Sequence, residues 1–64
     1  MAMSAQTDRE ILEEMDRRIQ AIKSAALELQ ELSAGIQAVY RNADRILASV
    51  KMLEINVSDV LDVL

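Results

Sequence analysis

Apolar side chains recur along this sequence at alternating spacings of three and four residues, from Leu12 almost to the end of the chain. When Leu12 is assigned to position a of a seven-residue repeat, positions a, d and g are apolar except at Arg18, Ser33 and Glu54. The neighbouring e positions hold only polar residues. This spacing is typical of an amphipathic α-helix, so the sequence predicts an all-α fold.

The width of the apolar stripe determines how many helices are needed to cover it. A two-stranded coiled coil uses only the a and d positions, whereas here the g positions are apolar as well. One partner helix cannot cover so wide a face, and the pattern favours a bundle of about three or four helices. Because each Leu, Ile or Val side chain left in water costs about 1.5–3 kcal/mol, we predict a multi-chain coiled coil or helical bundle.

The only glycine, Gly35, lies almost at the midpoint and decides between a rod and a hairpin. The seven-residue phase crosses it without a shift, and no Asn, Asp or Pro beside it marks a turn. These observations favour one continuous helix over about 7–55, in which Gly35 faces solvent at a cost of about 1 kcal/mol. The alternative is an antiparallel hairpin broken at 33–35, with Gly35 in the left-handed conformation.

We expect a flexible tail at residues 1–6 and a single helical oligomerisation module at residues 7–64. Thr7 and Glu10 have the spacing of a capping box, which predicts that the helix begins at Thr7. Near the other end, Asn56 and Ser58 are residues that favour helix caps. The segment after about residue 55 is therefore either a continuing helix or a short, kinked one.

Four residues of the stripe carry a polar group. We expect Ser33 to bond a backbone carbonyl one turn back, and Tyr40 to fill the core with its hydroxyl at the edge. Arg18 and Glu54 are expected to extend along the apolar surface until their charges reach water. The alternatives are that Ser33 fixes the register between helices, that Arg18 selects a partner through an ion pair, and that Tyr40 anchors in a binding groove.

The chain has 64 residues and contains neither cysteine nor histidine. Chains of this size bury only about 60% of their unfolded surface, and they are usually reinforced by disulfides, a metal ion or a partner chain. Disulfides are excluded, and a zinc site is not expected without these ligands. A partner chain is therefore the expected reinforcement.

The net charge of −4 disfavours nucleic acid and anionic membranes as partners, because an acidic chain is repelled by both. No apolar run approaches the ~20 residues of a membrane span, and the first ten residues do not resemble a signal peptide. We therefore expect a soluble, cytoplasmic protein. Without histidine, cysteine or a glycine-rich phosphate loop, we expect no enzyme activity, cofactor, metal site or small-molecule substrate.

These observations together predict a non-enzymatic assembly or scaffold protein, which oligomerises with itself or with other helical subunits through its a, d and g positions. The alternative is a small acidic helical regulator or chaperone that binds an amphipathic helix of a client protein. The residues predicted to form the protein interface are Ile11, Leu12, Met15, Ile19, Ile22, Leu29, Leu32, Ile36, Val39, Tyr40, Ile46, Leu47, Val50 and Leu53.

Overall fold

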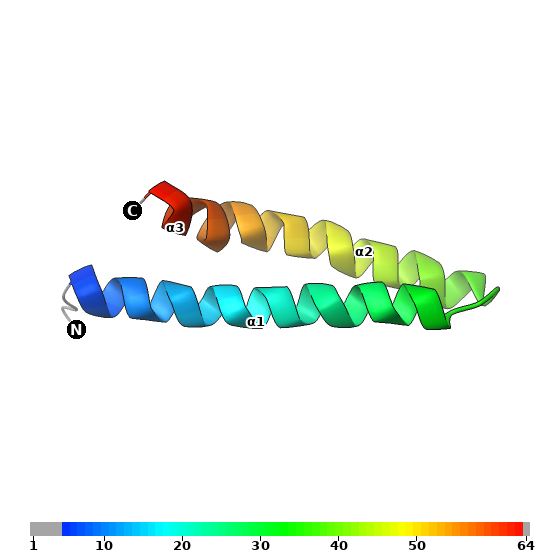
Figure 1. Ribbon diagram of the computed structural model, residues 1–64. Helices are drawn as coiled ribbons and strands as arrows, with labels where there is room; N and C mark the ends of the chain where they lie inside the picture. Colours follow the sequence, from blue (N-terminus) through cyan, green and yellow to red (C-terminus); the bar gives the residue numbers. More distant parts are fainter. Residues whose placement is uncertain (1–4, 64) are drawn as a thin grey trace.

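The chain forms an antiparallel helical hairpin (Figure 1). The computed structural model describes residues 5–63, with side chains described from residue 8 onward. Helix α1 spans Ala5–Leu32, and after a turn the chain returns alongside it as α2, Gln37–Leu53. The second arm continues as a short π-helix, η1, Glu54–Ser58, and ends as α3, Asp59–Val63. The predicted all-α class is confirmed.

The turn between the arms is short and is closed by one backbone hydrogen bond. The Ile36 N–H donates to the Ser33 carbonyl oxygen at 2.7 Å, which encloses Ala34 and Gly35 in a four-residue turn. Both enclosed residues have positive φ, 34° and 95°, as in a type I′ turn. The Ser33 hydroxyl donates to the Gln30 carbonyl oxygen at 2.7 Å, so the expected serine-to-backbone bond forms, with the carbonyl three residues back and not the expected one four residues back.

The favoured prediction of one continuous helix is wrong, and its hairpin alternative is confirmed. The seven-residue phase crosses the turn without a shift, although the buried residues occupy a positions in the first arm and d positions in the second, so an unbroken phase does not require a continuous helix axis. The turn needs no Asn, Asp or Pro, because Gly35 adopts positive φ without steric cost and Ala34 accepts it at about 1–2 kcal/mol. A Cβ on Gly35 would meet no atom within 4 Å, so there is room for a larger residue. Glycine is favoured here because of the positive φ of the backbone.

Helix α1 begins at Ala5, two residues before the predicted start at Thr7. The backbone of Thr7 is already helical, so this residue does not cap the helix. Ala5 and Gln6 are good helix formers, and nothing in the sequence separates them from the next turn. Of the flexible tail predicted at residues 1–6, the last two residues are helical and the first four lie outside the described residues.

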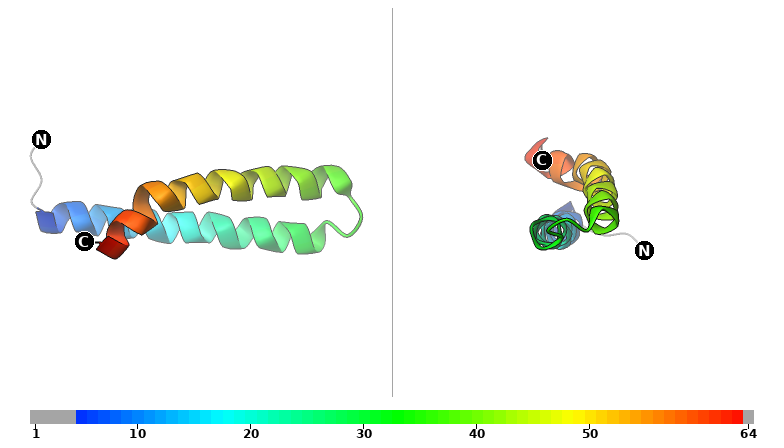
Figure 2. Two further views of the ribbon diagram at one scale, coloured as in Figure 1. Left: turned by 90° about the horizontal axis from the view of Figure 1, so that it is seen from above. Right: turned by 90° about the vertical axis from the view of Figure 1, so that its right-hand side faces the viewer.

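The second arm changes its helical geometry before it ends. The Asp59 N–H donates to the Glu54 carbonyl oxygen, five residues back instead of four, which adds one residue to this turn. Figure 2 shows α3 bent away from the axis of α2 beyond this wide turn. Of the two alternatives for the end of the chain, the structure therefore has the short, kinked one.

A narrow seam joins the two arms of the hairpin. Its buried residues recur every seven positions along each arm, and most of them are small. Small residues allow the helices to approach closely, but they bury little apolar surface. The core of the single hairpin is thus much smaller than the apolar stripe in the sequence. The buried residues of the seam are Ile19, Ala26, Ser33, Ala43 and Val50.

Candidate protein-binding surface

Helix α1 turns its a and e positions toward α2. At the a positions Ile19 and Ala26 are buried, and at the e positions Asp16, Lys23 and Gln30 are half-buried. The sequence pattern predicted a contact through a, d and g. In an α-helix of 3.6 residues per turn, d and g lie on one side of a, and e lies on the other. The contact with α2 therefore leaves the d and g positions of α1 uncovered.

Large apolar side chains lie exposed or half-buried along one side of the hairpin. On α1 they occupy d positions, where Ile22 and Leu29 are 44% and 42% exposed, and on α2 they occupy g positions such as Ile46. The two rows lie on the same side of the seam, because Ile22, Leu29 and Ile46 line one depression between the arms. We call this surface the apolar face, and its residues are Met15, Ile22, Leu29, Val39, Ile46 and Leu53.

The depression in the apolar face has the form of a coiled-coil hole. On α1 it is lined by Ile22, Ala25, Ala26 and Leu29, and on α2 by Ile46, and it encloses about 240 Å³. The four α1 residues occupy positions i, i+3, i+4 and i+7, which is the set that receives one knob side chain from a facing helix in a coiled coil. The hole therefore fits an apolar side chain of another helix.

A second depression, of about 450 Å³, lies at the turn and is lined in part by Ile36, Tyr40 and Arg41. Tyr40 is 52% exposed, so it lies outside the seam between α1 and α2, and its place in the core of a multi-chain bundle stays a prediction. The reason is its place in the first turn of α2, at the tip of the hairpin, where α1 has almost ended. Its ring lines a depression, as the alternative of an anchor in a groove requires.

The other side of the seam is closed by polar contacts between α1 and η1. The Lys23 ammonium lies 3.2 Å from Glu54 Oε2, and the Gln20 amide donates to the same oxygen at 3.2 Å. One helical turn further, the Ser58 hydroxyl donates to the Asp16 carboxylate. We call this set the polar edge: Asp16, Gln20, Lys23, Glu54 and Ser58.

Glu54 does not extend into water as predicted. Its side chain is only 18% exposed, and it accepts hydrogen bonds from two side chains of α1. The hydrogen bonds from Gln20 and then Lys23 lower the pKa of Glu54 below its ordinary value of 4.5. The sequence contained both charges, but their pairing depends on the hairpin, which brings residues 31 positions apart together.

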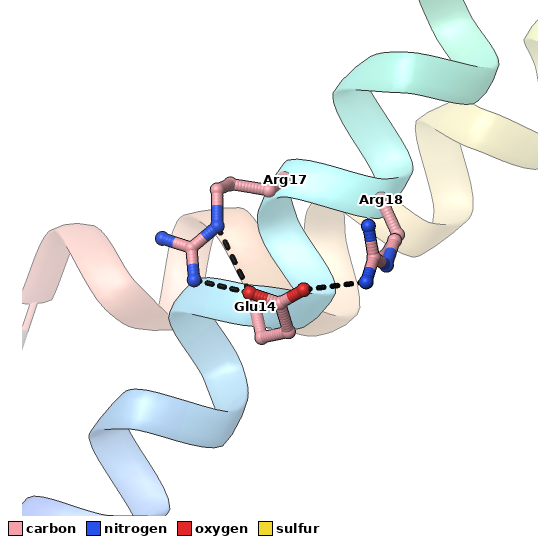
Figure 3. Close-up of polar contacts among 3 residues, drawn as sticks. All are labelled: Glu14, Arg17 and Arg18. Atoms are coloured by element: carbon pink, nitrogen blue, oxygen red, sulfur yellow. Dashed lines mark hydrogen bonds and ion pairs between the residues drawn. The ribbon is translucent and has the colours of Figure 1, made fainter.

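A charged cluster lies near the start of α1 (Figure 3). Glu14 lies between two arginines: Arg18 Nη2 is 2.8 Å from its Oε1, and Arg17 Nε donates to its Oε2 at 3.0 Å. The hydrogen bond from Arg17, followed by the charges of Arg17 and Arg18, lowers the pKa of Glu14. Arg18 is exposed, as predicted, and its ion pair is formed within α1.

The predicted interface residues fall into three groups by exposure. Those buried in the seam are Ile19 and Val50. Those half-buried are Ile11, Leu12, Val39 and Leu47. Those exposed are Met15, Ile22, Leu29, Leu32, Ile36, Tyr40, Ile46 and Leu53. The prediction left out two alanines of the seam, which the repeat marks only weakly, and the polar edge, whose members meet only once the chain turns back.

Two further classes of site are absent from the described part of the chain. Within residues 5–63, no three acidic residues gather closely enough to hold a metal ion, and no helix combines the length and hydropathy of a membrane span. Comparison with known proteins gave no matching family model, no similar curated protein and no similar solved structure.

Proposed function

We propose that this chain is a non-enzymatic helical assembly module, a scaffold subunit that packs its apolar face against helices of other protein chains. The observation that carries the proposal is the uncovered state of this face. The same two helices that bury a thin seam of mostly small residues expose two rows of Met, Leu and Ile side chains beside it, one row on each arm. Contiguous apolar patches on small proteins mark protein–protein contact sites.

The seam alone contributes little to the stability of the hairpin. Of its buried apolar residues, only Ile19 and Val50 are large, and each contributes about 1.5–3 kcal/mol. Ala26 and Ala43 add less, and half-buried neighbours such as Leu47 add part of their full value. Ordering the backbone costs about 1–2 kcal/mol per residue. Two long helices therefore need more burial than the seam provides.

Covering the apolar face supplies the missing burial. Its five exposed members, Met15, Ile22, Leu29, Ile46 and Leu53, each expose between 38% and 47% of their surface. Since full burial of such a side chain contributes about 1.5–3 kcal/mol, covering the exposed part contributes roughly 1 kcal/mol each. The sum is several kcal/mol, a large part of the ~5–15 kcal/mol that stabilises a typical domain.

The polar edge directs a partner to the apolar face. A helix docking against the polar edge would have to remove water from Lys23 and Glu54, whose charges already satisfy one another. Desolvating a paired charge costs free energy that apolar packing does not return. One side of the seam thus accepts a helix and the other resists it, which gives the module a defined docking direction.

A small helical chaperone is the second candidate function. The depression between Ile22, Leu29 and Ile46 draws its walls from both arms, so it forms part of a groove. A groove of this kind accepts the apolar side of an amphipathic client helix. A chaperone would remain a monomer until a client binds, whereas a scaffold subunit associates in its absence.

The experiment is a light-scattering mass measurement, with helicity by circular dichroism followed over a dilution series. We expect association of the wild-type chain and loss of helicity on dilution. Leu29→Lys should weaken association by roughly tenfold or more. Leu27→Lys is the matched control, because Leu27 is 45% exposed on the same helix but lies off the apolar face. A stable folded monomer, or equal effects of the two variants, would contradict the proposal.

A further inference from the structure

The residues that lie level with the coiled-coil hole bear on which side chain would fill it. Ile46 of α2 lies level with the hole on α1, because it lines the same depression as Ala25 and Ala26. The depression stays open although Ile46 forms part of its wall, so Ile46 does not fill the hole of its own chain. The occupant must be an apolar side chain that approaches from above the face, on a helix running alongside α1.

A second copy of the hairpin presents such a side chain at the right height. If the copy is related by a two-fold axis that runs along the hairpin, every residue keeps its height along the axis. Helix α2 of the copy then lies over α1, and Ile46 of the copy lies over the hole. The rows also match, because Met15, Ile22 and Leu29 on α1 repeat every seven residues, as the g positions do on α2. A self-complementary surface of this kind is what a two-fold interface requires.

The size of the hairpin agrees with this occupant. Its broad side measures 48 by 21 Å, so a second hairpin has room to lie along the whole length of the apolar face. Two hairpins supply four helices, which is the number that an apolar stripe of a, d and g positions favours. Each helix then has antiparallel neighbours within and between copies, which aligns the helix dipoles favourably.

We propose that the apolar face is the interface of a homodimer, in which two hairpins pack with their turns at the same end and Ile46 of each copy fills the hole on α1 of the other. This inference rests on the proposed function and names its partner. It also places the exposed Leu32, Ile36 and Tyr40 of both copies together at one end of the bundle.

The first test is the mass and dissociation constant of the full chain by sedimentation equilibrium. We expect twice the 7.1 kDa chain mass. Ala25→Glu, which closes the hole, and Ile46→Ala, which removes the knob, should each raise the dissociation constant roughly tenfold or more. Ala48→Glu and Met52→Ala are the matched controls, since both residues are exposed on α2 outside the apolar face.

The second test measures the orientation of the two copies. A spin label on Ala38→Cys lies close to the turn, and the chain has no other cysteine. With adjacent helices about 8–10 Å apart, turns at the same end should place the two labels within roughly 20–30 Å. A separation approaching the 48 Å length of the hairpin would overturn the proposed arrangement.

Failure of the homodimer can be distinguished from failure of the proposed function. A stable folded monomer would overturn both. A chain that is unfolded alone and becomes helical only when mixed with a different amphipathic helical peptide would overturn the homodimer, while supporting the broader assembly role. A trimer or larger species would also overturn the dimer.

Discussion

The apolar face and the polar edge flank the same seam, on the same two arms. The side chains of the polar edge are paired within the chain, whereas those of the apolar face remain exposed. The polar edge is closed within the chain: Lys23 pairs with Glu54, and Ser58 bonds Asp16. The apolar face, only part of a helix turn away, leaves Ile22 and Leu29 more than 40% exposed. The polar groups on one side of the hairpin are paired, and the apolar side chains on the other side are uncovered. A further helix is therefore expected to pack on the apolar face and not on the polar edge.

The contrast between the paired polar edge and the uncovered apolar face explains why the seam can bury so little apolar surface. The paired polar groups fix how the second arm lies against α1, but they add little stability, because partly exposed ion pairs are weak. Under the proposed function, the remaining burial comes from the apolar face when a helix of another chain packs against it. Folding and assembly are therefore expected to be coupled in this chain.

The largest expected effect comes from placing a charge on the apolar face. Ile22→Asp should raise the dissociation constant of the assembly roughly a hundredfold or more, because the carboxylate would be buried without a partner. Ser24→Asp introduces the same group two residues away at an exposed position and should change it little. Titration by sedimentation equilibrium checks both variants. If both weaken association equally, the apolar face has no special role.

The second effect concerns the turn at Ala34 and Gly35, which brings the two arms together and so forms both the apolar face and the polar edge. Gly35→Ala should lower the free energy of unfolding by about 1–2 kcal/mol, because alanine is strained at a φ of 95°. Ala34→Gly is the opposite control and should stabilise the chain by up to about 1 kcal/mol, since Ala34 already has positive φ. Urea denaturation measures both values. A gain of stability in Gly35→Ala would mean that the helix runs through the turn.

Sequence periodicity was sufficient to predict the helical class, and all six residues of the apolar face are among the predicted interface residues. It could not locate the turn, because the repeat has the same phase in both arms and a single glycine is compatible with either form. Periodicity also led to the wrong prediction that the charge of Glu54 reaches water, because its pairing with Lys23 exists only after the chain folds back. Contacts between distant residues depend on topology, which a local repeat does not contain.

A smaller effect is expected from the polar edge on acidification. The pKa of Glu54 lies below its ordinary value of 4.5 in the folded chain, owing to hydrogen bonds from Gln20 and Lys23. Its contribution to stability is thus fully present above about pH 4.5 and is lost as the pH falls through the lowered pKa. Thermal melts between about pH 6 and pH 3 should show a steeper loss for wild type than for Glu54→Gln.

The control for this experiment is Glu28→Gln, which removes an exposed carboxylate of α1 outside the polar edge. It shows how much of the change follows from removing one negative charge. An equally steep loss in wild type and Glu54→Gln would contradict a stabilising role for the polar edge.

The smallest effect is expected from salt. Each chain carries a net charge of −4, so two copies repel one another weakly across an interface that is itself apolar. Raising the salt from about 50 mM to about 500 mM should therefore strengthen association by roughly two- to threefold, because the repulsion is screened. Weaker association at high salt would indicate that opposite charges attract across the interface.

Solvent access to individual methyl groups tests the central claim most directly. In a solution of the full chain at associating concentration, a soluble paramagnetic agent broadens the methyl signals of residues that it can reach. Leu27 and Leu29 have nearly equal exposure in the single hairpin, 45% and 42%. If a second chain covers the apolar face, the Leu29 methyl signals will be protected and those of Leu27 will broaden. Equal broadening of both would contradict the account.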